Sequence, residues 1–417
     1  MTYRMIENAA EVATPTGHSA LQGRAMGQLR LIPAGAVIWR DETILFVGTG
    51  QEAQDWLRKN EISPEEVDRM DASGKTVIPG FVDPHTHFVF GGYRDQEFNR
   101  RLQGASYMEI MEAGGGIAAS TRATHAASER ELYEAAWKRL DRMLDLGITT
   151  VEGKTGYGED TETEDKMLRV MEALAADHKL DIALTYMGAH AVPPTFKGRT
   201  ADYVDYLIRE GLPMARGRAE FCDIFTERNV FELEESERLL IAARQMGFKL
   251  KMHADEIVPL GGAGLAARMG AISADHLLKA SDEDLLAMRE AGVIAVLLPL
   301  TAFSLREPYA RGRFMIEQGL AVALGTDLNP GSCHSQSIPL MIALSTIYMG
   351  LTVEETLTAL TLNAAAALDR AGRLGSLEEG KQADILILDC PNHGHLSYHF
   401  AMNLVETVIK RGVTVRG

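Results

Sequence analysis

Short apolar runs rich in β-branched residues alternate with longer amphipathic segments through most of the chain. From about residue 77 eight such runs occur, and most end in a polar residue or a glycine: TVIPGFVD, ITTVEGK, DIALTYMGAH, FCDIFTE, KLKMHAD, AISADHL, VIAVLLPL and LAVALGTD. Near-continuous apolar strands that alternate with helices are typical of a parallel sheet covered on both faces. Eight such units predict an α/β fold, a (β/α)8 barrel of the TIM type.

The amphipathic segments between these runs predict helices. Examples are ERELYEAAWKRLDRMLDLG, DTETEDKMLRVMEALAADH, ELEESERLLIAARQMG and SDEDLLAMREAG. Several of these helices are expected to end at a glycine, namely at Gly147, Gly247 and Gly292, because glycine adopts the left-handed conformation of a helix C-terminus at low cost. The run AGGGI from residue 113 is expected to form a mobile loop near the rim of the barrel.

The two ends of the chain have a different pattern. Residues 28–48, QLRLIPAGAVIWRDETILFVG, predict two strands around a turn at residues 40–42, and KQADILILDC and ETVIKRGVTV are also β-like. Neither end alone has enough apolar surface for a stable domain. We therefore expect both ends to form one small β-sandwich. Its N-terminal part would be residues 1–78 and its C-terminal part residues 373–417, with the barrel at residues 79–372.

Composition narrows the range of partners. Hydrophobic residues make up 46% and charged residues 24% of the chain, as in ordinary globular proteins. The formal net charge of −16 argues against nucleic acid or an anionic membrane as a partner. Cys222, Cys333 and Cys390 form no C-x-x-C pattern, which indicates reduced thiols. With no export signal and no apolar run of membrane length, we expect a cytoplasmic protein.

Chemistry-bearing residues gather at the predicted strand ends, where barrels of this type place their active sites. Five of the twelve histidines fall there, together with Asp327 at the end of strand eight. His85 and His87 are two residues apart at the end of strand one, so their side chains point the same way. The other three histidines at strand ends are His190, His253 and His276.

A metal ion explains this set. A single histidine at a strand end is usually a hydrogen-bonded core residue, but five that converge on one rim indicate a metal site. Three imidazoles and one carboxylate around a divalent ion, with an open position for water, suit hydrolysis. The expected ligands are His85, His87, His253 and Asp327.

One ion is expected rather than two. The end of strand four, DIFTE, carries no lysine that could be carboxylated to bridge a second ion. Lys154 on strand two is expected to pair with Glu152 or another neighbouring carboxylate. Nitrogen and oxygen ligands of this kind accept zinc, iron, manganese or cobalt, so the sequence leaves the metal open.

Several motifs resemble a known family. PGFVDPHTH, HAD, SADH and GTDLNPG are similar to the metal-dependent amidohydrolase superfamily, and GGYRDQEF and KTGYG resemble more closely the imidazolonepropionase family. The matching motifs run in order from about residue 79 to residue 340. Members of that family open the imidazolone ring in histidine degradation. One departure from the family is visible. The family commonly has IKSGYG where this chain has GKTGYG. Thr155 in place of serine keeps the hydroxyl, whereas Gly153 is expected to loosen the strand end and could alter how Tyr157 is held.

The resemblance implies a reaction and a set of residues. The implied substrate is 4-imidazolone-5-propanoate, hydrolysed at its cyclic amide C–N bond to N-formimidoyl-L-glutamate, with one zinc or iron ion on the four ligands given above and a homodimeric assembly. It also implies substrate contacts from Arg94, Tyr157, His190, Glu256, Asn329, Gly331 and Ser332.

Roles can be assigned to some of these side chains. Asp327 can take a proton from the attacking water and pass it to the leaving nitrogen, and His276 is placed to donate to the carbonyl oxygen. Arg94 suits the propionate, because a guanidinium matches a carboxylate bidentately. Tyr157 would bind the tail or cover the ring, and His190 would donate to the substrate. Glu256 either accepts from a ring N–H or serves as the proton-transfer base, and the sequence leaves both roles open.

Two other functions have to be weighed. A purine or pyrimidine deaminase on the same scaffold would release ammonia and would have no use for a carboxylate-binding Arg94. A non-catalytic scaffold protein would be expected to lack metal ligands, whereas all four are present here. Imidazolone hydrolysis is therefore the expected function.

Overall fold

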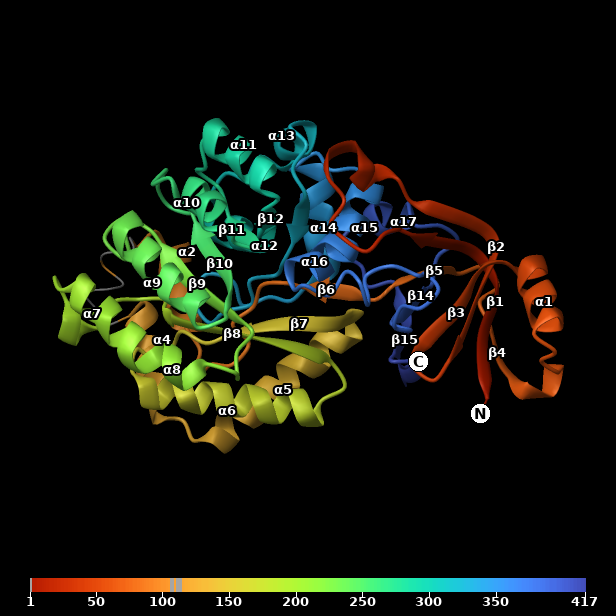
Figure 1. Ribbon diagram of the computed structural model, residues 1–417, viewed down its shortest axis with the longest axis horizontal. Coiled ribbons are helices and arrows are strands. Elements are labelled where there is room, and N and C mark those ends of the chain that lie inside the picture. Colours follow the sequence, from red (N-terminus) through yellow and green to blue (C-terminus); the bar gives the residue numbers. More distant parts are fainter. Residues whose placement is uncertain (1, 106–108, 110–114) are drawn as a thin grey trace.

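The fold is organised around two sheets, which Figure 1 shows side by side in a computed structural model that describes residues 2–105, 109 and 115–417. One of them, the barrel sheet, has eight strands whose spatial order follows the chain, and every neighbouring pair is parallel. Its strands are β6 (Phe81–Asp83), β7 (Ile148–Lys154), β8 (Asp181–Ala189), β9 (Phe221–Thr226), β10 (Lys249–Ala254), β11 (Ser273–His276), β12 (Ile294–Leu297) and β13 (Val322–Leu324). The prediction of eight parallel strands is confirmed.

The first and last strands of this sheet meet just beyond their ends. A parallel bridge joins Thr86 to Leu328, and the His87 amide donates to the Leu328 carbonyl at 2.9 Å. The Asp327 amide donates to the His85 carbonyl, also at 2.9 Å. These bonds close the sheet into a barrel, and they lie at the histidine pair of the PHTH motif.

Helices cover the outside of the barrel, as Figure 1 shows for α5, α6 and α8. The predicted helix ends hold, because Gly147, Gly247 and Gly292 have φ values of 84°, 95° and 74°. The AGGGI run begins with residues 113 and 114, which lie outside the described residues. The α-helices are α1 (Gly50–Lys59), α2 (Asp95–Leu102), α4 (Ile117–Ala126), α5 (Glu129–Asp145), α6 (Thr161–Asp177), α7 (Thr200–Tyr206), α8 (Leu212–Ala215), α9 (Leu233–Gln245), α10 (Gly262–Met269), α11 (Asp282–Ala291), α12 (Pro299–Leu305), α13 (Gly312–Glu317), α14 (Ile338–Ile347), α15 (Val353–Leu360), α16 (Leu362–Ala367) and α17 (His395–Tyr398).

The second sheet, the terminal sheet, is built from both ends of the chain. Its order is β16-β15-β14-β5-β1-β2-β3, and β4 also pairs with β1. The expected separate unit formed by both ends is therefore present. The exact division at residues 78 and 372 stays a prediction. The strands are β1 (Tyr3–Thr14), β2 (Arg30–Arg40), β3 (Thr43–Thr49), β4 (Val67–Asp71), β5 (Thr76–Pro79), β14 (Ile385–Leu388), β15 (Val405–Lys410) and β16 (Val413–Arg416).

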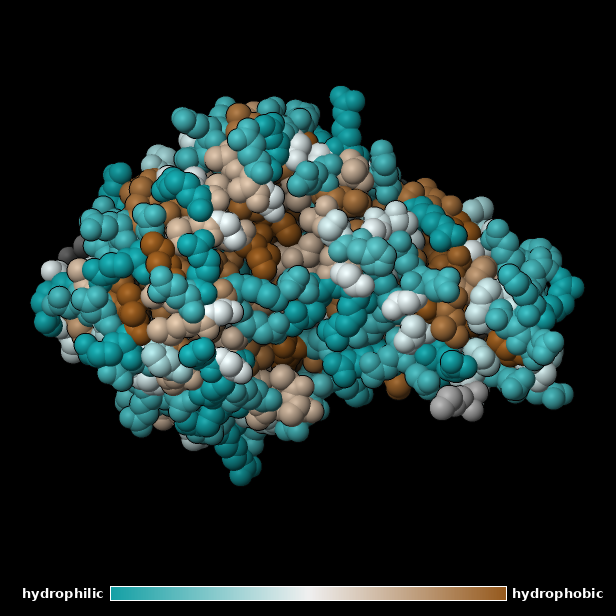
Figure 2. Space-filling view, viewed as in Figure 1, coloured by the Kyte–Doolittle hydropathy of each residue, from teal (hydrophilic) through white to brown (hydrophobic). Residues whose placement is uncertain are grey.

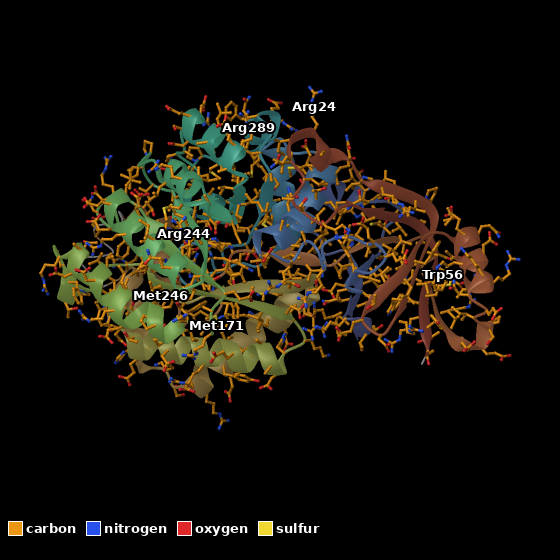
Figure 3. All side chains as sticks on the ribbon, in the orientation of Figure 1. Arg24, Trp56, Met171, Arg244, Met246 and Arg289 are labelled. Atoms are coloured by element: carbon orange, nitrogen blue, oxygen red, sulfur yellow. The ribbon has the colours of Figure 1, made fainter. Side chains whose placement is uncertain are left out.

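The terminal sheet carries its own small cores. Trp56 of α1 packs edge-on against Tyr3 at 6.4 Å and lies 6.2 Å from Phe46, measured between ring centroids. Figure 3 shows Trp56 at the end of the molecule away from the barrel. The face in Figure 2 is largely hydrophilic, with separate hydrophobic areas between polar ones. Within the described ranges, no helix combines the length and the apolar character that crossing a bilayer needs.

Charged and polar side chains join the two sheets at a group of residues that we call the interface charge cluster: Asp181, Gln382, Asp384, Lys410 and Arg411. Lys410 Nζ donates to Asp384 at 2.6 Å and to Asp181 at 3.0 Å, and Gln382 Nε2 donates to Asp181 at 3.1 Å. Arg411 also bonds Asp181. Burial alone would raise the pKa of Asp181, but Lys410 and the other donors lower it to about 2. The start of β8 is thereby fastened to the β15–β16 hairpin.

Candidate active site and metal centre

Three imidazoles converge at the carboxyl ends of β6 and β10. The ring centroids of His85 and His253 are 4.5 Å apart, and His87 lies 5.6 Å from each of them. All three side chains are buried. The strand geometry predicted this meeting for His85 and His87, and the barrel adds His253 from 166 residues further along the chain.

Second partners decide which ring nitrogen faces the centre. His85 Nδ1 lies 2.6 Å from a carboxylate oxygen of Asp275, and His253 Nδ1 lies 3.1 Å from Asp223. Because carboxylates accept, each Nδ1 carries the proton and each Nε2 is left with a lone pair. Carboxylate–histidine pairs of this kind orient the ligands of metal sites.

The fit to a cation is tested by nitrogens that have no protein partner. His85 Nε2 and His87 Nδ1 are buried and make no hydrogen bond within the described part of the chain. A buried nitrogen without a partner is costly, and a cation would satisfy both. The ligand atoms form two overlapping triplets, each with all atoms within 4.8 Å of one another: His85, His87 and His253, and then His85, His276 and Asp327. The residues present therefore suit a divalent ion.

Asp327 and His276 approach this centre on strained backbone. Both have positive φ, 51° for Asp327 and 75° for His276, a region that residues other than glycine rarely adopt. Thr301 Oγ1 donates to Asp327 Oδ2 at 2.6 Å, so Oδ1 is left toward His85 Nε2, 3.5 Å away. Strain of this kind clusters at functional sites, where the surrounding structure holds a side chain in place.

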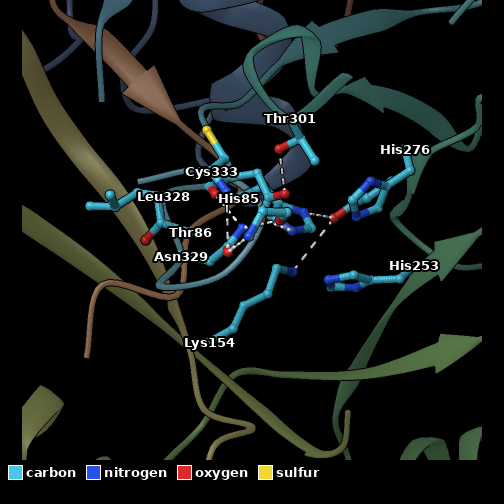
Figure 4. A network of polar contacts seen from close by, with 12 residues as sticks. His85, Thr86, Lys154, His253, His276, Thr301, Leu328, Asn329 and Cys333 are labelled. Atoms are coloured by element: carbon cyan, nitrogen blue, oxygen red, sulfur yellow. Dashed lines mark hydrogen bonds and ion pairs between the residues drawn. The ribbon is translucent and has the colours of Figure 1, made fainter. Parts of the chain in front are cut away.

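Beneath the imidazoles lies a group of charged residues that we call the barrel-core charge cluster: Glu152, Lys154, Asp223, Lys251 and Asp275. All five are fully buried. Lys154 Nζ donates to Asp223 at 2.6 Å and to Glu152 at 3.1 Å, and Lys251 Nζ donates to Glu152 at 2.7 Å. Figure 4 shows Lys154 close to His85 and His253. The expected pairing of Lys154 with Glu152 is present, and Asp223 and Asp275 complete it.

Lys154 of this cluster is held in its charged form. Burial alone would lower the pKa of Lys154, but the attraction of Asp223, Glu152 and Asp275 outweighs burial and raises it. Asp223 and Asp275 each contact both a lysine and an imidazole. His253 and Lys154 hold the pKa of Asp223 well below its usual value despite burial, whereas burial raises the pKa of Asp275 against the pull of Lys251 and Lys154. Both carboxylates accept from an Nδ1–H, which keeps His85 and His253 in the tautomer described above.

A cavity of about 330 Å³ opens above the imidazoles. It brings together most of the residues that the sequence predicted. His85 is the exception, because it lies below the cavity floor. The predicted residues that line the cavity are His87, Arg94, Tyr157, His190, His253, Glu256, His276, Asp327, Asn329, Gly331 and Ser332.

The loop after β13 shapes one wall of this cavity. Asn329 Oδ1 accepts from the amides of Gly331 and Ser332, both at 2.8 Å. The turn places Gly331 against Arg94, where an added Cβ would come within 2.1 Å of Nη1. Glycine at position 331 therefore makes room for the guanidinium, and Asn329 holds the loop in this shape.

His190 presents an acceptor to the cavity. Its Nδ1 donates to the Gly156 carbonyl at 3.0 Å, and its ring stacks on His87 at 4.8 Å. Burial, and then the neighbouring His253, lowers the pKa of His190 to about 3, so the ring is neutral. Its Nε2 is therefore unprotonated and can accept from a ligand N–H. This geometry favours an acceptor role over the expected donor role. Tyr157 lies beside it, with ring centroids 5.2 Å apart.

Glu256 and His276 face each other on the opposite wall. His276 Nδ1 lies 3.6 Å from Glu256 Oε1, beyond hydrogen-bond distance. Burial, and then repulsion from Asp327 and Glu227, raises the pKa of Glu256 to about 8. Its carboxyl group therefore holds a proton at neutral pH, until a cation bound nearby lowers that pKa.

Comparisons with known proteins agree with this arrangement. A model described as "Amidohydrolase family" matches residues 76–415. The chain belongs to the amidohydrolase family. Proteins named imidazolonepropionase from Parabacteroides distasonis and Clostridium tetani are 54% and 52% identical to it, each over 98% of this chain and 97% of its own length. Among amidohydrolases the chain therefore belongs with the imidazolonepropionases.

The amidohydrolase fold is also found in solved structures. An atrazine chlorohydrolase from Arthrobacter aurescens TC1, complexed with zinc, superposes with a TM-score of 0.72. The match covers 99% of this chain and 95% of that one at 17% identity. Because this identity is low, the match shows only that the two proteins share a fold, namely the barrel and its terminal sheet.

The departure at Gly153 from the usual imidazolonepropionase pattern has a packing reason. A Cβ at Gly153 would lie 2.6 Å from the ring of Phe88 and 2.7 Å from Met171 Sδ. These two larger side chains fill the space, so the strand end is not loose. Thr155 keeps its hydroxyl in use, because the Met187 amide donates to it at 2.9 Å.

No role was predicted from the sequence for Asp223, Lys251 or Asp275. A signal was available. Lys251 and Asp223 stand inside apolar β-runs, where a charge has to be either exposed or paired. In a barrel strand that is buried on both faces only pairing is possible, so these residues could have been expected to meet.

Proposed function

We propose that this chain hydrolyses 4-imidazolone-5-propanoate to N-formimidoyl-L-glutamate with one divalent ion. One observation carries the proposal: a cluster of imidazoles suited to a cation and a guanidinium suited to a carboxylate line the same cavity. The substrate needs both, because a cyclic amide and a propionate are joined in one small molecule. The relatives named imidazolonepropionase, at 52–54% identity, support the same reaction.

The ion would be held by His85, His87, His253 and Asp327, and zinc or iron is the expected metal. When bound, such an ion polarises the amide carbonyl and makes a water molecule nucleophilic at neutral pH. The oxygen of water adds to the carbonyl carbon, the ring C–N bond breaks, and the nitrogen gains a proton. The remaining work is done by side chains of this chain.

Proton transfer falls to two carboxyl groups. Asp327 Oδ1, freed by the Thr301 bond to Oδ2, takes the proton from the attacking water. Glu256 lines the same cavity and faces His276, so we infer that it carries a proton to the leaving ring nitrogen. This choice favours proton transfer over the alternative of accepting from a ring N–H.

Other side chains bind and orient. His276 donates an N–H to the carbonyl oxygen as its negative charge grows, a contribution of about 3 kcal/mol when one donor is lost. Arg94 holds the propionate, and His190 Nε2 accepts from a ring N–H. Tyr157 covers the ring. Asn329, Gly331 and Ser332 shape the wall beside Arg94.

A turnover assay with metal analysis tests the proposal. The purified chain is given freshly prepared 4-imidazolone-5-propanoate, loss of its ultraviolet absorbance is followed, and the product is identified by mass. We expect turnover that stops on chelation and returns with zinc or iron. A metal-loaded protein without turnover, or one that releases ammonia from purines or pyrimidines instead, would contradict the substrate assignment.

The assembly and location complete the proposal. We expect a homodimer, since two-fold assemblies are the commonest among soluble enzymes, and a cytoplasmic enzyme without nucleic-acid or membrane partners. Light scattering of the purified chain at micromolar concentration tests the dimer. A monomer mass at that concentration would contradict it.

A further inference from the structure

One face of helix α2 lines the active-site cavity and carries charged side chains to which the proposed reaction assigns no role. Arg94 stands at the N-cap of this helix, and Glu97, Phe98 and Arg101 follow on the same side. The spacing of three, four and seven residues places all four on one helix face. Arg94 and Glu97 form an ion pair, whereas Arg101 has no role in the mechanism above.

The charges on this face do not cancel. Arg94 Nε donates to Glu97 Oε2 at 2.8 Å, and the Gly116 amide donates to the same oxygen at 3.1 Å. Glu97 is therefore occupied. Among the residues that the structure describes, Arg101 forms no ion pair. Burial and then the neighbouring Arg94 lower its pKa, while Glu97 acts in the opposite direction. Two guanidinium groups and one carboxylate leave one positive charge uncompensated on this wall.

Arg101 is nevertheless held in place. Its Nη2 donates to Ser304 Oγ of α12 at 3.3 Å, and its guanidinium carbon lies 5.2 Å from the centre of the Phe98 ring. A cation over an aromatic face is stabilised by the ring quadrupole. A half-buried arginine that is oriented by neutral contacts, beside a second arginine that repels it, is suited to an anion that is not part of the protein.

We propose that Arg101 is a second carboxylate-binding residue, which holds the propionate of the substrate together with Arg94. The inference rests on the proposed function and deepens it. Arg94 has its Nε occupied by Glu97 and offers its terminal nitrogens, while Arg101 supplies the uncompensated charge. The wall thereby matches a tail with one negative charge and disfavours a neutral one, so Arg101 determines specificity for the acid.

A purely structural role for Arg101 makes a different prediction. If its function were only to join α2 to α12 through Ser304, its loss would weaken every ligand of the cavity alike. If it binds the carboxylate, its loss would weaken acids and leave matched neutral ligands unchanged. The ratio of two inhibition constants separates these cases.

The probes are 3-(imidazol-4-yl)propanoate and its carboxamide, measured as competitive inhibitors of hydrolysis by the metal-loaded enzyme. In Arg101→Met we expect KM and the inhibition constant of the acid to rise roughly tenfold or more. We expect kcat and the constant of the carboxamide to stay within about twofold. Arg101→Lys keeps the charge and should recover part of the preference for the acid. Arg100→Met, which removes an exposed neighbour, is the matched control.

Each result bears on the inference. An unchanged acid-to-amide ratio in Arg101→Met, with turnover intact, would overturn it, as would an equal loss for both probes. If Arg101→Met does not fold, the same ratio in Arg101→Lys decides, because a ratio equal to that of the wild type in a shorter side chain would contradict a bidentate role. If the wild-type chain did not hydrolyse the substrate, that result would instead contradict the proposed function.

Discussion

Two groups of charged residues lie toward opposite ends of the barrel strands, and they differ in what they join. The barrel-core charge cluster is fully buried, and its carboxylates Asp223 and Asp275 each face a lysine and an imidazole. The interface charge cluster centres on Asp181, which binds Lys410 and Arg411 of the terminal sheet. The first orients side chains around one point, and the second fastens two sheets together.

The two clusters differ in whether their charges serve the active site or only the stability of the fold. Replacing a buried ion pair by apolar residues often costs no stability, so such pairs are poor evidence for stability by themselves. In the barrel core, apolar replacement would leave His85 and His253 without the carboxylates that fix their tautomer. At the interface no ligand depends on the charges, so their effect should be confined to stability. Four predictions test this distinction.

Loss of Asp327 should have the largest effect. Asp327→Ala removes an expected ligand and the expected proton acceptor together, so we expect kcat/KM to fall by at least about a thousandfold. Asp181→Ala, at the interface, should keep kcat/KM within about twofold. Steady-state kinetics on metal-loaded proteins measure both, and substantial turnover in Asp327→Ala would remove that residue from the mechanism.

Loss of Lys154 should destabilise the fold most. Lys154→Met leaves Asp223, Glu152 and Asp275 without a shared cation inside the barrel, and breaking a buried pair typically costs about 3–5 kcal/mol. Urea unfolding followed by circular dichroism measures the change in the free energy of unfolding. Glu134→Gln, in an exposed ion pair with Arg130, is the control and should change it by less than about 0.5 kcal/mol. A cost below about 1 kcal/mol for Lys154→Met would mean that the carboxylates there are protonated.

Asp223→Asn should act on the metal more than on the fold. The amide keeps the shape but weakens the hold on His253 Nδ1, and loss of such an outer partner typically lowers metal affinity 10–100-fold. Competition with a chelator of known affinity measures this change. Asp384→Asn, the matching change in the interface charge cluster, should leave metal affinity unaltered. Equal losses of metal affinity in the two variants would contradict the distinction between the two charge clusters.

Replacing Asp181 should have the smallest effect of the four, and its effect on the free energy of unfolding should depend on pH. Its pKa in the folded protein is lowered to about 2 from the usual value near 4, so ionised Asp181 stabilises the fold by about 2 kcal/mol at neutral pH. This contribution is present above the unfolded pKa and is lost as pH falls from about 4 through 2. The difference in unfolding free energy between wild type and Asp181→Asn should therefore shrink over that range. A difference that is constant from pH 7 to 3 would contradict it.

The sequence was sufficient for the barrel but not for all of the terminal sheet. The eight apolar runs contain β6 to β13 in order, because strands buried on both faces carry a local signal. The start of the first run, Thr76–Pro79, instead forms β5 of the terminal sheet. β1 was not predicted. Its residues YRMIENAAEVAT mix polar side chains and alanines, Asn8 has φ of 60°, and the register with β2 shifts between Ile6 and Ala9. Such a strand is defined by partners that are distant in the chain.

The candidate site divides in the same way. The residues at the strand ends were enough to predict the four expected ligands, His190 and His276, because barrel topology places those ends on one rim. What the sequence could not supply was a direction for each side chain. That His190 offers an acceptor, and that Arg101 forms no ion pair with any residue that the structure describes, depend on contacts between segments far apart.

The terminal sheet also has a consequence for synthesis of the protein. β5 pairs with β1 on one side and with β14 on the other. On a ribosome β1 is made before β5, but β14 emerges 306 residues after Pro79. At roughly 5–20 residues per second, that edge of β5 stays open for about 15–60 s. Open strand edges invite pairing with other chains, so the nascent chain exposes an aggregation-prone edge until its last segment arrives.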